Sequence, residues 1–225
     1  MLKQKLIYQG KTKDVWENDD NTYTLKLKDD ATGTNGVFDP GANTVGLTIK
    51  GLGLASLKLT DYYFTLLEKN NIPTHYLGCN FDEVSLQVKK ATMFGSGLEF
   101  VCRLVANGSF IKRYGAYATK GQELDYIVEV TLKDDQRGDP PISCDILVAL
   151  DIMSIDEYEL CKKLTKQITK ILAQNLQEKS LTLHDIKYEF GKDNMGNIML
   201  IDEISGGCMR VYKDGIKVKP TDIEV

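Results

Sequence analysis

Two segments decide the fold of this chain: DIKYEFG at residues 185–191 and NIMLIDE at residues 197–203. Charged and apolar residues alternate through the first segment, which is the period-two pattern of a β-strand with one polar and one apolar face. The NMGN sequence at residues 194–197 supplies Asn and Gly, which tight turns favour. The pattern therefore predicts a β-hairpin that carries its charges on one face.

A turn centred between Met195 and Gly196 would place Glu189 directly opposite Asp202. Cross-strand partners have Cβ atoms about 5 Å apart, and two carboxylates at that distance repel each other unless a cation lies between them. Mg²⁺ usually takes one or two carboxylates and completes its shell with water and substrate phosphates. The pair is therefore a candidate Mg²⁺ site for a nucleotide. The alternative is a solvated charged face on an ordinary amphipathic hairpin.

The composition is that of an ordinary globular protein, with 225 residues of which 42% are hydrophobic and 27% are charged. A net charge of −4 argues against a nucleic-acid platform, and no apolar run approaches the roughly 18 residues of a membrane span. The start of the chain has no signal-peptide pattern, and the scattered cysteines favour reduced thiols. We therefore expect a cytoplasmic protein that binds neither nucleic acid nor membrane. A homo-oligomer is compatible with the sequence.

The N-terminal part is predicted to be rich in β-strands. Two strands flank Gly10 within residues 6–17, and residues 23–28 form a third. Residues 29–51 are rich in Gly, Asp, Asn and Thr and predict a long loop without an apolar period. Apolar residues at helical spacing predict a helix over residues 52–70.

The clearest helix is predicted over residues 155–178. Ser154 followed three residues later by Glu157 is a capping-box pattern at its start. The apolar stripe along this helix indicates core packing. A short strand pair is predicted over residues 210–218, with its turn at residues 213–215.

A glycine turn between two strands carries lysines. Gly10 allows backbone N–H groups to approach a phosphate closely, and Lys11 and Lys13 add positive charge. P-loop spacing is absent, so the pattern indicates a strand–loop–strand cover over phosphates. The alternative is an ordinary hairpin with exposed lysines.

Arginines mark a second candidate site, for an anion. Arg103 interrupts an apolar strand and needs an anionic partner if it is buried, while Ser109 offers a hydroxyl at a nearby turn. Arg210 follows the Gly206-Gly207 pair, which would allow close backbone approach to a ligand. These groups suit a ligand phosphate or carboxylate. The alternatives are an internal salt bridge for Arg103 and a flexible loop at residues 206–207.

Together, an acidic pair for a metal, lysines at a glycine turn and arginines for a second anion suit ATP chemistry on an anionic small molecule. The chain also resembles the SAICAR synthetase family of purine biosynthesis. The resemblance is carried by four stretches, at residues 10–15, 26–36, 101–115 and 185–210.

The resemblance implies a two-lobed α+β fold with a kinase-like ATP cleft. The N-terminal β-rich nucleotide-binding lobe would span residues 1–90, and the C-terminal α/β lobe with the metal and acceptor sites would span residues 91–225. It also implies an ATP-dependent ligase that joins carboxyaminoimidazole ribonucleotide to L-aspartate and releases ADP and phosphate. ATP and Mg²⁺ are the implied cofactors, and small molecules are the implied partners.

The resemblance further implies roles for single residues. The implied nucleotide-binding residues are Gly10, Lys11, Lys13 and Lys89. The implied residues for the ribonucleotide phosphate are Arg103, Ser109 and Arg210. The implied Mg²⁺ ligands are Glu189 and Asp202. The implied residues facing the reacting groups are Asp185 and Lys187.

Two departures from the family pattern leave alternatives open. Gly206-Gly207 stands where the family usually has Pro-Asp, in the part of the pattern that belongs to the ribonucleotide site. The chain ends at Val225, where the resemblance would predict a further helix. The alternatives are a ligase of the same fold with a different acid and amine, a small-molecule kinase, and a nucleotide-binding protein without catalysis.

Overall fold

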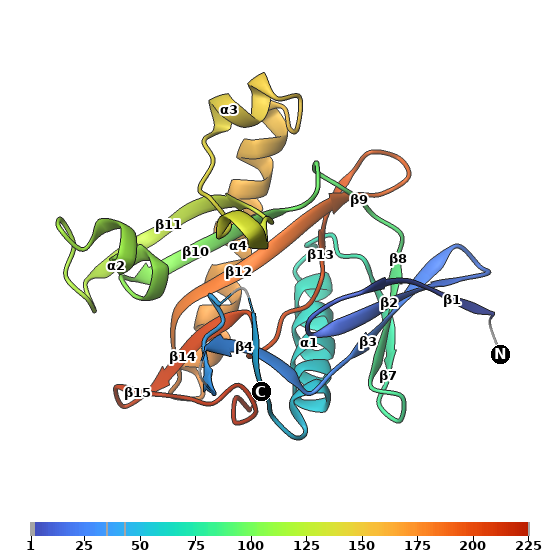
Figure 1. Cartoon of the computed structure of the whole chain (residues 1–225), viewed down its shortest axis with the longest axis horizontal. Coiled ribbons are helices and arrows are strands. Elements are labelled where there is room, and N and C mark those ends of the chain that lie inside the picture. Colours follow the sequence, from blue (N-terminus) through green and yellow to red (C-terminus); the bar gives the residue numbers. More distant parts are fainter. Residues whose placement is uncertain (1–2, 35, 43, 225) are drawn as a thin grey trace. The chain divides into compact units, whose positions relative to one another are not determined.

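The computed structural model describes residues 3–34, 36–42 and 44–224 (Figure 1). Asn35, part of one stretch that carries the resemblance, lies outside the described residues. The chain forms two units. The first comprises residues 1–92, 192–207 and 219–225, and the second comprises residues 93–191 and 208–218.

The predicted division after residue 90 assigned residues 192–207 and 219–225 to the C-terminal lobe, but both segments fold with the first unit. The reason is backbone pairing at residues 198–201. The N–H of His75 donates to the carbonyl of Leu200 at 3.0 Å, and the N–H of Leu200 donates to the carbonyl of Pro73 at 2.9 Å. Such long-range pairing leaves no signal in local composition.

The first unit contains an antiparallel sheet with the strand order β1-β2-β3-β8-β7. Its strands are β1 (Gln4–Gln9), β2 (Lys13–Asn18), β3 (Thr22–Leu27), β7 (Tyr76–Asn80) and β8 (Ser85–Lys89). The first three confirm the strands predicted on either side of Gly10 and over residues 23–28. Strand β13 (Ile198–Ile201) also belongs to this unit.

The loop predicted over residues 29–51 is wrong in part. It contains three short strands that pair with one another in the order β5-β4-β6. They are β4 (Asp30–Thr34), β5 (Val37–Phe38) and β6 (Val45–Thr48). Their glycines explain the missing apolar signal: a Cβ at Gly46 would lie 2.4 Å from the carbonyl carbon of Gly33, so the strands can approach only without side chains.

Helix α1 (Leu52–Lys69) confirms the prediction over residues 52–70. It buries an apolar stripe that includes Leu57, Tyr63 and Leu67. Its N-terminus has no side-chain cap of its own. Instead, the carboxylate of Asp29 accepts hydrogen bonds from the N–H groups of Gly51 and Gly53, each at 2.9 Å. The segment before the helix is thereby tied to β3.

The second unit contains an antiparallel sheet with the strand order β11-β10-β12-β14-β15. Its strands are β10 (Leu98–Val105), β11 (Glu123–Leu132), β12 (Thr182–Lys192), β14 (Met209–Lys213) and β15 (Ile216–Lys217). The strand pair predicted over residues 210–218 is thus confirmed. Its turn has positive φ at Asp214 (50°) and Gly215 (77°), as a tight hairpin requires. The division of the chain between the two units falls within the short strand β9 (Thr92–Met93).

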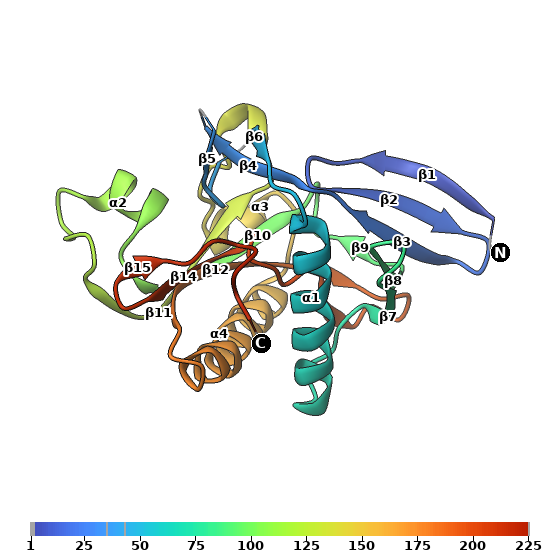
Figure 2. The same cartoon turned by 90° about the horizontal axis from the view of Figure 1, so that it is seen from below.

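Helix α4 (Ile155–Gln177) packs along the sheet of the second unit (Figures 1 and 2). The predicted capping box between Ser154 and Glu157 is confirmed. The apolar stripe of α4 is buried, and the Thr169 hydroxyl, which donates to the carbonyl of Thr165 at 2.7 Å, lies 3.2 Å from the Tyr188 hydroxyl of β12. The shorter helices are α2 (Gly108–Tyr114), α3 (Cys144–Ala149) and a 3₁₀ turn (Asp135–Arg137). In the described part of the chain, no helix combines the length and apolar character needed to cross a membrane.

The turn after β12 differs from the predicted one. The N–H of Asp193 donates to the carbonyl of Asn197 at 2.9 Å, so the turn is centred on Met195 and not between Met195 and Gly196. Strand β13 ends at Ile201, and Asp202 lies beyond it with a φ of 69°. The prediction that Glu189 lies directly opposite Asp202 assumed a turn centred between Met195 and Gly196 and a second strand that includes Asp202. Both assumptions are wrong.

Candidate active site

The glycine turn between β1 and β2 is rigidly built. The N–H of Gly10 donates to the carbonyl of Lys13 at 2.9 Å, and a Cβ at Gly10 would lie 2.7 Å from the same oxygen. Only glycine therefore fits this turn. The ammonium of Lys28 contacts the turn, since it lies 3.0 Å from the Gly10 carbonyl oxygen and 2.5 Å from Asp14 Oδ1. Lys11 lies on the turn and is half-buried.

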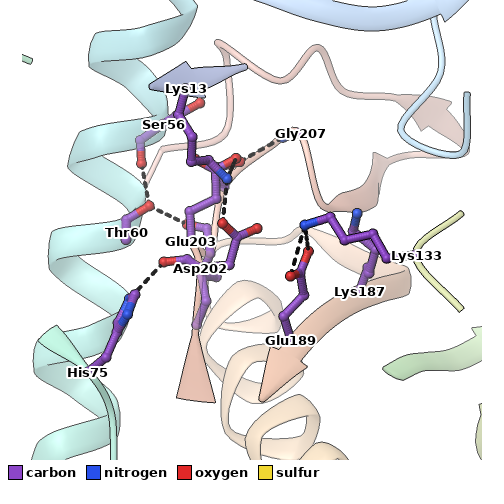
Figure 3. Close-up of polar contacts among 12 residues, drawn as sticks. Lys13, Ser56, Thr60, His75, Lys133, Lys187, Glu189, Asp202, Glu203 and Gly207 are labelled. Carbon is purple, nitrogen blue, oxygen red and sulfur yellow. Dashed lines mark hydrogen bonds and ion pairs between the residues drawn. The ribbon is translucent and has the colours of Figure 1, made fainter. Parts of the chain in front are cut away.

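Lys13 is directed at two acidic residues of the same unit (Figure 3). Its Nζ lies 2.5 Å from Asp202 Oδ1 and 3.5 Å from Glu203 Oε1. The side chains of Lys13 and Asp202 are 13% and 21% exposed, so the pair is only partly open to solvent. In this structure the Asp202 carboxylate is therefore ion-paired with an ammonium group.

The segment that carries these carboxylates is held through its main chain. His75 Nε2 lies 3.0 Å from the carbonyl oxygen of Asp202, and the Thr60 hydroxyl lies 3.1 Å from the carbonyl oxygen of Ile204 (Figure 3). His75 is 4% exposed, and burial lowers its pKa to about 4. A carbonyl can only accept, so the neutral imidazole donates from Nε2.

The buried His75 predicts acid sensitivity in the metal-free protein. The unfolded imidazole binds a proton below its ordinary pKa of 6.5, whereas the folded one stays neutral until about pH 4. The contribution of His75 to the free energy of unfolding is therefore fully present above about pH 6.5, and it is lost progressively as the pH falls toward 4. We expect a loss of about 2–3 kcal/mol between pH 7.5 and 4.5 from this residue. Urea unfolding at both pH values, with His75→Gln as the control, measures it. An equal loss in the variant would contradict the prediction.

Lys89 ends β8, and its predicted place beside an adenine stays a prediction. Its ammonium donates to the carbonyl of Thr74 at 3.2 Å, and its N–H donates to the carbonyl of His75 at 2.7 Å. Lys89 also lines a cavity of about 370 Å³ together with Glu68 and Asp193. The lining is mixed polar and apolar.

In the second unit, a buried carboxylate joins two arginines. Arg210 Nη1 donates to both oxygens of Asp185, at 2.9 and 3.0 Å, and Arg103 Nη1 lies 3.5 Å from Asp185 Oδ2. The exposed fractions of Asp185, Arg103 and Arg210 are 2%, 3% and 8%. The structure thus brings together three of the predicted site residues. Ser109 joins them, because its hydroxyl accepts from Arg103 Nη2 at 2.9 Å.

A second carboxylate completes this arginine cluster. Glu129 accepts from Arg103 Nε and from Arg113 Nη2, the latter at 2.7 Å. Burial raises the pKa of Glu129, but the two guanidinium groups more than offset this and hold the pKa below its usual value. Among the described contacts of this cluster, three arginines therefore face two carboxylates, which is a net charge of +1. The internal salt bridge considered for Arg103 exists, and the excess charge still suits an anion.

One buried nitrogen of the cluster is not satisfied. Arg103 Nη1 is buried and makes no hydrogen bond, since its contact with Asp185 is too long for one. Gly108, with a φ of 52°, lies against the guanidinium of Arg210, where an added Cβ would meet Cζ at 2.7 Å. The backbone at Gly108 and the guanidinium of Arg210 are therefore in close contact.

Acidic and basic groups alternate across β10 and β12. Glu99 lies directly opposite Glu189 in the register, and two lysines neutralise them. Lys187 Nζ lies 2.6 Å from Glu99 Oε1. Lys133 Nζ lies 2.7 and 2.9 Å from the two oxygens of Glu189 (Figure 3). Burial lowers the pKa of Lys187, but Glu99 and Glu189 outweigh it and raise the pKa above its usual value. Lys187 is therefore a firmly protonated ammonium group.

The alternative of a solvated hairpin face is excluded by burial. Asp185 and Glu189 are only 2% and 5% exposed, and both are ion-paired. Charged side chains are rarely buried this deeply unless they are paired or functional.

Sequence reasoning missed several residues that complete these networks. They are Lys28, Glu99, Glu129 and Lys133. Glu99 could have been predicted from the sequence, because residues four apart in a strand lie on the same face of the sheet, and Glu99 is four residues before Arg103. Lys133 follows β11 and has no signal in the sequence that would link it to Glu189.

Comparison with known proteins agrees with the α+β fold and with an enzyme of the ligase class. A family model described as SAICAR synthetase matches residues 6–222. A phosphoribosylaminoimidazole-succinocarboxamide synthase of Clostridium tetani is 55% identical over 220 residues, which cover 97% of each chain. The chain belongs to the SAICAR synthetase family.

Solved structures support the same assignment. A SAICAR synthetase in complex with ADP matches with a TM-score of 0.82 and 35% identity, covering 94% of this chain and 85% of that one. A phosphoribosylaminoimidazole-succinocarboxamide synthase from Ehrlichia chaffeensis matches with a TM-score of 0.84 and 26% identity, covering 95% and 88% of the two chains. The two-lobed fold implied by the resemblance is thus confirmed as the SAICAR synthetase fold.

Proposed function

We infer that this chain catalyses the reaction for which its family is named, as an ATP-dependent ligase of purine biosynthesis. It joins the carboxylate of carboxyaminoimidazole ribonucleotide to the amine of L-aspartate, with ATP converted to ADP and phosphate. The observation that carries this inference is the 55% identity to a relative of that name over 97% of both chains.

The chemistry requires activation of a carboxylate. A carboxylate is a poor electrophile, and its oxide is a poor leaving group. Transfer of the γ-phosphoryl group to one of its oxygens gives an acyl phosphate and ADP. The aspartate amine then attacks the acyl carbon, the C–N bond forms, and phosphate leaves as the amine loses a proton.

Nucleotide binding is assigned to the first unit. We propose that Gly10, Lys11 and Lys13 cover the ATP phosphates and that Lys89 borders the adenine. The glycine turn supports this, because the hydrogen bond from the Gly10 N–H to the Lys13 carbonyl fixes a loop that carries two lysines. A relative that matches over 94% of this chain was solved with ADP.

Mg²⁺ fits the donor groups of Glu189 and Asp202, and we propose these two as its ligands. Both offer carboxylate oxygens, which Mg²⁺ prefers. Each carboxylate already accepts a cation in this structure, namely Lys133 for Glu189 and Lys13 for Asp202. When bound, Mg²⁺ would neutralise charge on the phosphates.

The acceptor substrate is assigned to the second unit. We propose that Arg103, Ser109 and Arg210 hold the ribonucleotide phosphate, supported by the excess positive charge and the unsatisfied Arg103 Nη1. Asp185 and Lys187 are proposed to face the reacting groups. Lys187 acts as a protonated group that stabilises negative charge, and Asp185 orients the two guanidinium groups that it contacts.

The departure at Gly206 has a local structural cause. A Cβ at Gly206 would lie 2.4 Å from the carbonyl oxygen of Pro220. The backbones at these two residues approach so closely that only glycine fits at position 206. The packing of the chain thus accounts for Gly206, whereas an added Cβ at Gly207 would meet only the Ser205 hydroxyl, at 3.2 Å, so nothing in the described part of the chain explains the glycine at that position.

An ADP-release assay tests the reaction. With the imidazole ribonucleotide and ATP, we expect ADP formation to rise about 100-fold or more when L-aspartate is added, because the amine consumes the acyl phosphate. A small-molecule kinase would release ADP equally without any amine and leave a stable phosphorylated product. A binding protein would form no ADP. Turnover only with another acid or amine would reject the proposed substrates.

The cytoplasmic location and a homo-oligomeric assembly stay proposals. Light scattering coupled to size-exclusion chromatography measures the second of these directly.

A further inference from the structure

The segment that follows β13 is held at two main-chain carbonyls by buried side chains of the first unit. Thr60, in α1, is fully buried, and its single hydroxyl proton is shared between the carbonyl of Ser56 at 2.7 Å and the carbonyl of Ile204 at 3.1 Å. His75, just before β7, is 4% exposed and lies with Nε2 3.0 Å from the carbonyl of Asp202. Figure 3 shows both side chains pointing at the main chain of this segment from the same side.

Asp202 needs such an anchor because its backbone is unusual. Its φ of 69° lies in the left-handed region, which residues with a Cβ adopt rarely, Asp and Asn more readily than most. A residue in that conformation keeps it only where its surroundings fix it. The carbonyl of Asp202 is fixed by the imidazole, and its carboxylate is contacted separately by Lys13 at 2.5 Å.

We propose that His75 is a positioning residue for the Asp202 carboxylate, which it aims by holding the left-handed main chain of that residue. This rests on the proposed function of Asp202 as a Mg²⁺ ligand. The contact uses only the carbonyl oxygen, so it persists when a cation replaces Lys13 at the carboxylate.

The imidazole is itself fixed in place. Its ring packs edge-on against Phe64, with the centroids 5.6 Å apart and the planes at 87°. Its backbone is tied on both sides, to Leu200 at 3.0 Å and to Lys89 at 2.7 Å. A donor held this firmly can fix the geometry of the residue that it contacts.

Mn²⁺ binding to the protein–ADP complex, followed by the electron paramagnetic resonance of free Mn²⁺, tests the proposal. His75→Phe keeps a buried ring but removes the donor, and we expect about tenfold weaker Mn²⁺ binding, as the loss of one buried hydrogen bond would produce. ADP affinity in EDTA should stay within about twofold. His75→Gln, whose amide nitrogen can reach the Nε2 position, should restore Mn²⁺ binding to within about threefold.

Turnover provides a second readout. For His75→Phe we expect the Mg²⁺ concentration at half-maximal rate to rise about tenfold, with kcat within about threefold of wild type. Phe64→Leu, which disturbs the packing around the imidazole but keeps the donor, is the matched control and should leave Mn²⁺ affinity unchanged.

The outcomes separate this inference from the metal assignment. If Asp202→Asn weakens Mn²⁺ binding and His75→Phe does not, the positioning role is overturned while the metal ligand stands. If Asp202→Asn binds Mn²⁺ as wild type does, the metal assignment fails, and this inference fails with it. If His75→Phe does not fold, His75→Asn replaces it in the test. The Asn side chain is one methylene shorter than that of Gln, so its amide does not reach the Asp202 carbonyl. Equal Mn²⁺ affinities for the Asn and Gln variants would then overturn the proposal.

Discussion

Asp202→Asn and Glu189→Gln are each expected to lower kcat/KM for ATP by about 10³-fold or more, with the fold intact. Each substitution removes a negative charge from a proposed metal ligand and keeps its size. Asn is chosen at position 202 because it tolerates the φ of 69° there. The coupled ADP assay across a Mg²⁺ titration gives the rate, and circular dichroism gives the fold.

The matched control for these carboxylates is Glu17→Gln. Glu17 is also an acid paired with a lysine, but its side chain and that of Lys90 are 37% and 49% exposed. An exposed pair contributes little, so this variant should be as active as wild type. Wild-type rates in both site variants would reject Glu189 and Asp202 as the metal ligands, whatever the reaction.

Arg210→Met is expected to raise the KM for the ribonucleotide about 100-fold or more and to destabilise the protein by about 3 kcal/mol. The binding loss follows from the removal of a guanidinium proposed to hold the phosphate. The stability loss follows because Asp185, 2% exposed, would lose the two hydrogen bonds that Arg210 donates. Steady-state kinetics below the unfolding transition and urea titration measure the two effects.

Two further variants separate binding from stability. Ser109→Ala removes one hydrogen bond to Arg103 and should raise the same KM several-fold with little loss of stability. Arg137→Met, in an ion pair whose arginine side chain is 73% exposed, should change neither quantity. If Arg210→Met lowered stability but left the KM unchanged, the cluster would be a structural salt bridge only.

Much of the site was predictable because its residues lie within short segments. The alternation through residues 185–190 predicted a strand and Gly10 predicted a turn, and both are present, while the anion site predicted from the arginines stays a prediction. Their charge partners were not predictable, because sheet register sets them. Glu99 faces Glu189 only because β10 and β12 pair in one register, and Glu129 reaches Arg103 across β10 and β11.

The sequence by itself determined the local structure of this protein. The capping box before α4, the apolar stripes of α1 and α4, and the Asp214-Gly215 turn all follow from interactions within a few residues. Only the tertiary structure decided whether the charged side chains are buried and ion-paired or exposed to solvent. Alternation looks the same for a solvated face and a buried one, and pairing between distant segments leaves Asp185 and Glu189 almost fully buried. The same long-range pairing returns residues 192–207 to the first unit, because backbone hydrogen bonds form between segments that are distant in sequence.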